Sequence, residues 1–234
     1  MSDFRTIGPL YCETPMSLPE GVVSTLEVFP IEPINAITSV FPALVGLYLV
    51  YWLSQRGQLL SPFLFFAVAT AMTGTGSVMW HGLRTPFSLA IDWIPGVISF
   101  MVFMFAWGYY LKNRWWGYAT LVGVFGGTWL FSAVASRLVE SNGPPSALFF
   151  VVAIISAILL YFTWKRYGTI AWWGVGMLGC AIAAAIVRTV DLATCGILPD
   201  FGTHAFWHIF LGVTSLFGLI MIVKIDEARK KGLE

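Results

Sequence analysis

Residues 87–111 read FSLAIDWIPGVISFMVFMFAWGYYL, and Asp92 is the one charged residue among them. About 20 consecutive apolar residues are enough to carry an α-helix across the hydrocarbon core of a bilayer. In hydrocarbon every backbone polar group must be satisfied within the segment, so a helix rather than a strand is expected. This stretch therefore predicts a transmembrane helix.

Six further apolar stretches of similar length occupy most of the remaining chain, at 35–54, 61–81, 117–137, 147–165, 170–191 and 204–224. The segments between them are short, so consecutive helices are expected to run antiparallel. Because no long soluble insertion interrupts the pattern, the sequence predicts one domain over residues 1–234. The predicted fold class is an all-α membrane protein, a seven-transmembrane helix bundle with an extramembrane N-terminal segment at 1–34 and a cytoplasmic tail at 225–234.

The overall composition agrees with a membrane protein. Hydrophobic residues make up 58% of the 234-residue chain and charged residues 11%, whereas soluble domains are roughly 25% charged. The net charge is +1, with no basic block or stripe, which argues against a nucleic-acid partner because its electrostatic footprint is missing. The lipid bilayer is thus the predicted partner.

Lysine and arginine are distributed unequally between the two ends of the predicted helices. Nine of the 13 basic residues lie on one side: Arg56, Lys112, Arg114, Lys165, Arg166, Lys224, Arg229, Lys230 and Lys231. Four lie on the other side: Arg5, Arg84, Arg137 and Arg188. Since short cytoplasmic loops are enriched in Lys and Arg, the C-terminus is predicted to be cytoplasmic and the N-terminus to be outside or in a lumen.

The three histidines of the chain fall at one predicted depth, near the outer face. His81 ends the second stretch, which runs outward, and His204 and His208 begin the seventh, which runs inward. Asp92 lies in the second turn of the third stretch, at the same depth, and Ser77 precedes His81 by four residues. Residues four apart share a helix face, so these polar side chains can all point into one layer.

The spacing of the histidines predicts a metal site. His204 and His208 have the spacing that lets two imidazoles bind one ion, and His81 from another helix would be a third ligand. Three histidines with one position open to water are the form of a catalytic zinc site, although iron or cobalt would suit imidazole as well. The alternative is three hydrogen-bonded interior histidines. Ionisable groups inside a membrane are costly and by default functional, which favours the metal.

The ordered set GTGSVMWHG, IDWIP and HAFWH resembles the alkaline ceramidases, and more widely the CREST superfamily of seven-span membrane hydrolases. The shared pattern is a serine four before a histidine, an aspartate at the start of the next helix, and a paired HxxxH at the last. The resemblance implies zinc held by His81, His204 and His208, with Ser77 and Asp92 beside it. It also implies hydrolysis of the amide bond of ceramide to a sphingoid base and a fatty acid.

The mechanism hypothesised from these residues is that of a zinc-dependent lipid amidase. Zinc held by neutral imidazoles lowers the pKa of bound water to about 7 and polarises a carbonyl group. Asp92 is expected to accept the proton of that water and to deliver it to the leaving amine. Ser77 lacks a free base, because His81 would be bound to metal, and is expected to hydrogen-bond the oxyanion or the water.

The N-terminal segment matches the same family in part. The ceramidases have a calcium site there, built from an Asp-Trp-Cys-Glu-x-Asn stretch and a later glutamate three residues before an asparagine, where this chain has LYCETP and EPIN. Glu13 and Glu32 match, whereas Leu10 and Pro15 replace two oxygen donors. Ca²⁺ takes roughly six to eight oxygen ligands, so backbone and water would have to supply the rest. Glu13 and Glu32 are therefore either calcium ligands or solvated, interfacial charges.

The cysteines give a further expectation. Cys12 and Cys195 both fall on the predicted outer side, where an oxidising compartment would allow a disulfide; two free thiols are the alternative. The family resemblance favours the bond, since the family has a cysteine at the position of Cys12. Cys180 lies inside the sixth stretch and is expected to be a small apolar filler.

Helix-end signals lie near the same face. Thr85 followed by Pro86 is expected to be an N-cap with proline in the first turn. Arg188 and Asp191 are three apart, and we expect them to pair with each other or to cap the helix. A contact with a lipid headgroup is the alternative for this pair.

Other functions compete with ceramide hydrolysis. The same chemistry could act on another N-acyl or ester lipid, and a non-catalytic, receptor-like lipid-binding protein would hold zinc without turnover. A retinal-type pigment or pump needs a lysine in the middle of the last helix. Because Lys224 lies at the cytoplasmic end of that helix, the sequence argues against the third class.

Overall fold

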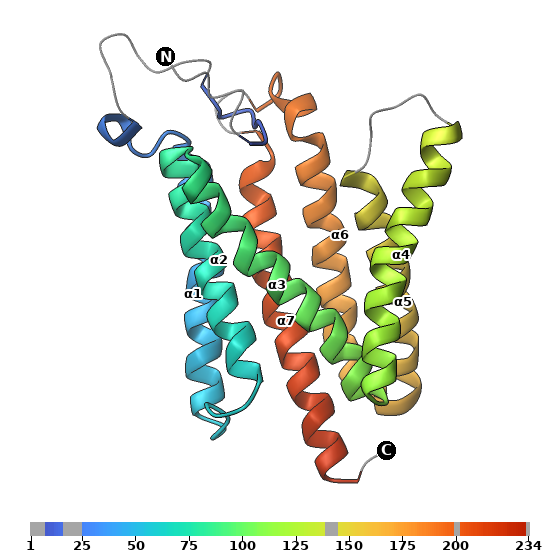
Figure 1. Ribbon diagram of the computed structural model, residues 1–234. Coiled ribbons are helices and arrows are strands. Elements are labelled where there is room, and N and C mark those ends of the chain that lie inside the picture. The colour runs from blue at the N-terminus through green and yellow to red at the C-terminus, as the bar shows by residue number, and fades with distance from the viewer. Residues whose placement is uncertain (1–7, 16–24, 139–144, 199–201, 233–234) are drawn as a thin grey trace. The chain divides into compact units, whose positions relative to one another are not determined.

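The computed structural model describes residues 8–15, 25–138, 145–198 and 202–232, and within these ranges it is all-helical, without a β-strand. The helices are α1 Pro33–Ser54, α2 Phe63–Leu83, α3 Pro86–Leu111, α4 Arg114–Leu138, α5 Pro145–Tyr167, α6 Ala171–Thr194 and α7 His204–Lys230 (Figure 1). In the same ranges two short 3₁₀-helices accompany them, η2 Thr25–Val28 and η3 Gly168–Ile170. Parts of the predicted N-terminal segment (1–7 and 16–24) and the last two residues of the predicted tail lie outside the described residues.

Each apolar stretch predicted from the sequence coincides with an α-helix. Among the described residues, six helical segments are long and apolar enough to cross a membrane. The fifth of these, Ala147–Thr194, runs through α5, η3 and α6. The length and composition of the helices support a multi-pass membrane protein.

Large apolar side chains lie on the outside of the helices. Leu44 on α1 is 58% exposed, and Val122 and Trp129 on α4 are 71% and 73% exposed. Water would penalise an apolar surface of this extent, which on soluble proteins is confined to small patches. An apolar surface of this kind is compatible with surrounding lipid tails.

The chain divides into two compact units. The first contains residues 1–99 and 183–216, and the second contains residues 100–182 and 217–234. Three helices, α3, α6 and α7, begin in one unit and end in the other. Every residue that the sequence assigns to the candidate site lies in the first unit.

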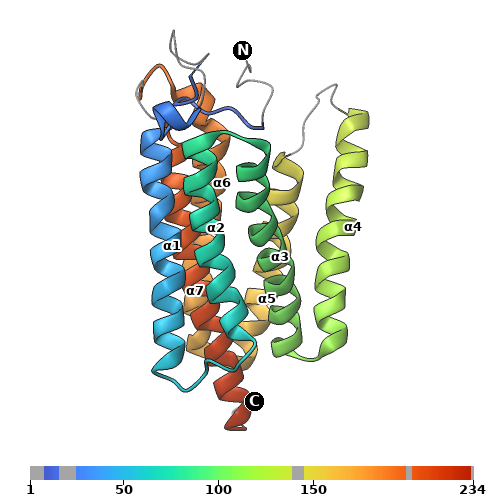
Figure 2. The same ribbon diagram turned by 60° about the vertical axis from the view of Figure 1, so that its left-hand side comes forward.

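In the first unit, close helix contacts depend on small residues. A side chain at Gly46 of α1 would collide with the backbone of Ala71 on α2, and one at Gly74 of α2 would collide with the backbone of Ala43. The two helices accordingly lie side by side in both views (Figures 1 and 2). Gly76 gives the same close approach between α2 and the backbone of α3 at Ile91. Small residues at such interfaces are typical of membrane helices.

The start of α3 confirms the predicted cap. The Thr85 hydroxyl accepts a hydrogen bond from the Ser88 backbone N–H (3.1 Å), and the Ser88 hydroxyl accepts one from the Thr85 N–H (3.0 Å). This reciprocal pair is the arrangement of a capping box, and Pro86 occupies the first helical position. The cap fixes where α3 begins, and therefore sets Asp92 in the second turn of the helix.

The second unit contains α4, α5 and most of the second half of α3. Its core includes Trp107, which is fully buried and donates a hydrogen bond to the Thr163 hydroxyl (3.0 Å). The end of α7 differs from the predicted span at 204–224, because the helix continues to Lys230. Four of the six residues at 225–230 are charged, but the segment favours helix, and Lys230 pairs with Asp226 one turn earlier (2.6 Å).

Candidate metal centre

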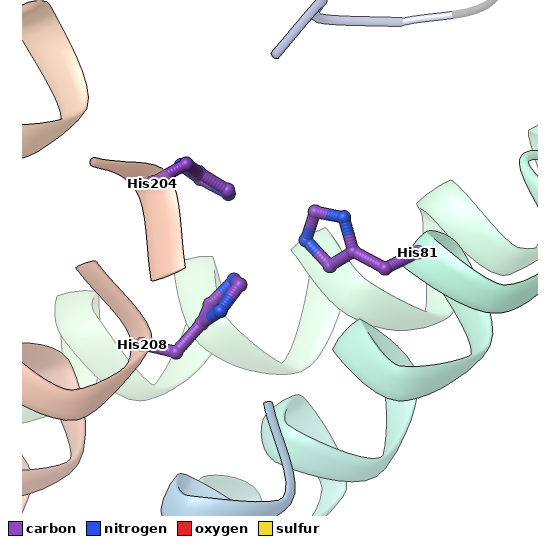
Figure 3. Close-up of side chains that lie close together, drawn as sticks. All are labelled: His81, His204 and His208. Atoms are coloured by element: carbon purple, nitrogen blue, oxygen red, sulfur yellow. The ribbon is translucent and has the colours of Figure 1, made fainter. Parts of the chain in front are cut away.

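Three histidines converge at one point in the first unit. His81 lies in the last turn of α2, and His204 and His208 lie in the first turns of α7 (Figure 3). They are 1%, 2% and 3% exposed, and their candidate ligand atoms all lie within 4.8 Å of one another. The structure thus brings together the three side chains that the sequence predicted as ligands, in a set that could hold a metal ion.

The first turn of α7 is held in place by a carboxylate from α6. Asp191 is fully buried, and its Oδ1 accepts hydrogen bonds from the backbone N–H groups of Thr203 (2.8 Å) and His204 (2.7 Å). The first N–H groups of a helix have no partner within it, and an acceptor there stabilises the helix end. Asp191 therefore caps α7, a helix other than its own, and fixes the backbone that carries His204.

Hydrogen bonds orient two of the three imidazoles. The Nδ1 of His81 is paired with the Glu32 carboxylate, and the Nδ1 of His208 lies 3.0 Å from the Thr38 hydroxyl. Both rings therefore present Nε2 to the centre, and the Nε2 of His208 lies 3.5 Å from the Ser77 hydroxyl. The Nδ1 of His204 is buried without a hydrogen-bond partner among the described residues. Buried polar atoms are normally satisfied, so an unpaired nitrogen in this cluster fits a metal ligand.

Ser77 and Asp92 lie beside the histidines. The Ser77 side chain is buried, one turn before His81 on α2, and accepts a hydrogen bond from Ser39 (3.0 Å). Asp92 is half-buried on α3, and its carboxyl lies near the Ser77 hydroxyl. Ser77 thus lies near both Asp92 and His208.

Glu32 is not a solvated charge, so that interpretation of the sequence is wrong for this residue. Its carboxylate is fully buried, and besides His81 it contacts the Thr14 hydroxyl (2.5 Å) and the Arg84 guanidinium (3.3 Å). Burial raises the pKa of Glu32 to about 7, while the nearby Arg84 acts in the opposite direction. The sequence offered a calcium ligand as the other interpretation of Glu32; in the structure its carboxylate pairs with the Nδ1 of the candidate metal ligand His81.

Glu13 caps a helix. Its carboxylate accepts hydrogen bonds from the backbone N–H groups of Ile34 (2.6 Å) and Asn35 (2.8 Å), in the first turn of α1. Burial raises the pKa of Glu13, and the two backbone hydrogen bonds oppose that shift. A calcium ion at Glu13 and Glu32 stays a prediction, and both carboxylates already have partners in the protein.

Tyr11 belongs to the site but carries no signal in the sequence. Its ring is buried and stacks on the imidazole of His204, with 3.8 Å between ring centroids. The guanidinium carbon of Arg188 lies 4.7 Å from the centre of the Tyr11 ring. Burial raises the pKa of Tyr11 to about 12, so its phenol stays protonated at neutral pH. Tyr11 therefore covers the histidine cluster as a neutral aromatic group.

Cys12 and Cys195 form a disulfide in the structure, across 183 residues of sequence. The backbone N–H of Cys12 also donates a hydrogen bond to the Oδ2 of Asp191 (3.0 Å), the carboxylate that caps α7. The bond therefore joins the N-terminal segment that carries Tyr11 to the end of α6. Both segments contact His204.

Replacing Cys195 with serine is expected to lower the melting temperature of the purified protein by roughly 5–15 °C, because a disulfide typically contributes about 2–4 kcal/mol to stability. Thermal denaturation in detergent measures the shift. The control is Cys180→Ser, which removes the free thiol of α6 and should leave the melting temperature nearly unchanged. Equal melting temperatures for the Cys195 variant and the wild type would contradict this prediction.

No protein-family model matches the chain, and a comparison with curated proteins found no match. Function is therefore argued from the chemistry of the side chains. Neutral imidazole nitrogens suit zinc, iron or cobalt, and three protein ligands leave a coordination position for a reacting group. An acid and a hydroxyl beside such a set are the components of metal-assisted hydrolysis.

Proposed function

We propose that this protein is a zinc-dependent hydrolase of a membrane lipid. The observation that carries the proposal is the cluster of three buried histidines, whose ligand atoms lie within 4.8 Å of one another, with Ser77 and Asp92 beside them. Buried histidines placed only for helix packing would be expected to have hydrogen-bond partners for their nitrogens. The unpaired Nδ1 of His204 is better explained by an ion.

The side chains have separate roles in this proposal. His81, His204 and His208 would hold zinc, which supplies a lowered pKa for water and polarisation of the carbonyl group. Asp92 accepts a proton from the attacking water and donates it to the leaving group. Ser77, with both nitrogens of His81 already engaged, donates a hydrogen bond to the oxygen on which negative charge develops.

The proposed substrate is an N-acyl lipid, most simply ceramide, which would give a sphingoid base and a fatty acid. The support is the ordered resemblance of the Ser77–His81, Asp92 and HAFWH motifs to the alkaline ceramidases. The location also supports it, because the site lies at the ends of apolar helices. A lipid can place its amide there while its tails stay in hydrocarbon.

The proposed topology is seven transmembrane spans, with the N-terminus outside or lumenal and the C-terminus cytoplasmic. The break at η3, where Gly168 has a φ of 54°, separates α5 from α6 and supports counting them as two spans. The excess of Lys and Arg on the side of the C-terminus supports the direction. In this topology the histidine cluster lies near the outer or lumenal face.

Metal analysis combined with a lipid panel tests the proposed function. The purified protein should contain about one zinc per chain and release fatty acid from ceramide, with other N-acyl and ester lipids assayed in parallel. A zinc chelator such as 1,10-phenanthroline should abolish hydrolysis, whereas the calcium chelator EGTA should not. Zinc without turnover of any lipid would favour the receptor-like alternative, and turnover by metal-free protein would overturn the metal mechanism.

A further inference from the structure

Glu32 makes two contacts with His81, at the end of α2. Its backbone N–H donates a hydrogen bond to the carbonyl of His81 (2.9 Å), and its side chain pairs with the Nδ1 of the His81 ring. The preceding residue repeats the backbone contact, since the Ile31 N–H donates to the Gly82 carbonyl (3.1 Å). Gly82 leaves room for the Phe29 ring, with which a side chain at this position would collide. The segment before α1 therefore holds both the backbone and the ring of His81.

Arg84 supplies the positive charge next to this carboxylate. Its side chain is 1% exposed, its guanidinium lies 3.3 Å from the Glu32 carboxylate and 4.2 Å from the centre of the Trp80 ring, and it donates to the Pro9 carbonyl (2.9 Å). A buried carboxylate without a counter-charge is strongly destabilising. Arg84 therefore supplies the counter-charge of the buried Glu32 side chain behind His81.

The backbone at Arg84 is unusual. Its φ is 50°, which makes it the one non-glycine residue with a positive φ among the described residues. This left-handed conformation ends α2 and is unfavourable for residues with a Cβ. Glycine would adopt it without that cost. The turn therefore does not account for an arginine at this position, whereas the contacts of its side chain do.

We propose that Glu32 is a positioning residue of the metal centre and that Arg84 acts through it, so that this ion pair sets the orientation and basicity of His81 as a ligand. The inference rests on the proposed function, in which the three histidines hold a metal. Ligating histidines commonly give their second nitrogen to a carboxylate, and loss of that partner lowers metal affinity by about 10–100-fold. Here the carboxylate comes from the segment before α1 and its counter-charge from the end of α2.

Co²⁺ affinity of the purified full-length protein tests this assignment. The visible absorption of histidine-bound Co²⁺ reports both occupancy and coordination geometry, independently of hydrolysis. Glu32→Gln is expected to weaken Co²⁺ binding by about 10–100-fold and to shift the absorption bands. Far-UV circular dichroism and the melting temperature of the metal-free variant show that it is folded. Glu27→Gln is the matched control, because Glu27 is an exposed glutamate in η2, and it should retain wild-type Co²⁺ affinity.

Arg84 variants test whether the arginine acts through Glu32, and they remain informative if Glu32→Gln does not fold. Arg84→Gly removes the unfavourable left-handed backbone conformation of a non-glycine residue, but it also removes the positive charge. A roughly tenfold loss of Co²⁺ affinity is expected, within the range for residues that act on a metal ligand. Arg84→Lys keeps the charge and should recover most of that affinity. The double variant should bind no more weakly than Glu32→Gln alone, since residues acting as one unit are not additive. Additive losses would overturn the assigned role of Arg84.

The outcomes separate this inference from the function on which it rests. Wild-type protein that binds Co²⁺, together with a Glu32→Gln variant that binds it equally well, would overturn the positioning role and leave the metal centre intact. Wild-type protein that binds neither Co²⁺ nor Zn²⁺ would overturn both proposals.

Discussion

Replacing His208 with alanine is expected to remove bound zinc and to reduce lipid hydrolysis to background. His208 is 3% exposed, and Thr38 holds its Nδ1 so that Nε2 faces the other two rings. Without it two imidazoles remain, one fewer than the three protein ligands of a catalytic zinc site. Metal content measured by mass spectrometry and fatty-acid release from ceramide should fall together.

The control for His208 lies on the same helix turn. Phe206 is 42% exposed, and Phe206→Ala should retain zinc, which shows that loss of metal is specific to the ligand. An alanine variant at position 208 that is active and free of metal would contradict the proposed mechanism. Retention of one zinc per chain by the same variant would contradict the ligand set.

Replacing Asp92 with asparagine is expected to separate metal binding from turnover. Asparagine has nearly the same shape but cannot accept and return a proton, and loss of a general acid–base group typically costs about 10²–10⁴-fold in rate. Zinc content should stay near one per chain, because the three clustered ligands are histidines and Asp92 is not one of them. The rate constant for hydrolysis at saturating lipid is the measurement.

The same chemical change far from the site provides the control. Asp226 lies near the end of α7 in the second unit and pairs with Lys230, so Asp226→Asn should hydrolyse lipid at the wild-type rate. A normal rate in Asp92→Asn would exclude its role in proton transfer. Loss of zinc in that variant would instead make Asp92 a metal ligand.

The helices could be predicted because their signal is local. An apolar run such as 87–111 determines its own structure in a bilayer, whatever the rest of the chain does. The end of α7 was less predictable, because residues 225–230 are held in a helix by propensity and by the Asp226–Lys230 pair rather than by hydropathy. Hydropathy thus locates a span better than it locates the helix end.

The histidines could also be predicted, because spacing and topology are enough to place them in one layer. His204 and His208 share a face through their four-residue spacing, and the alternating direction of the helices places His81 at the same height. The partners of these histidines could not be predicted in this way. Glu32 is 49 residues from His81 in sequence, and Tyr11 reaches His204 from the opposite end of the chain. Such contacts depend on how loops fold back, for which neither hydropathy nor periodicity carries information.

The Cys12–Cys195 disulfide can form only late in the synthesis of the chain. Cys12 leaves the ribosome early, but its partner follows 183 residues later, after the whole of α1–α6 has been made. His204 and His208 are synthesised later still, because four helices, α3 to α6, lie between them and His81 in the chain. The histidine cluster is therefore among the last parts of the molecule to be completed, and a chain truncated before α7 would lack two of its three histidines.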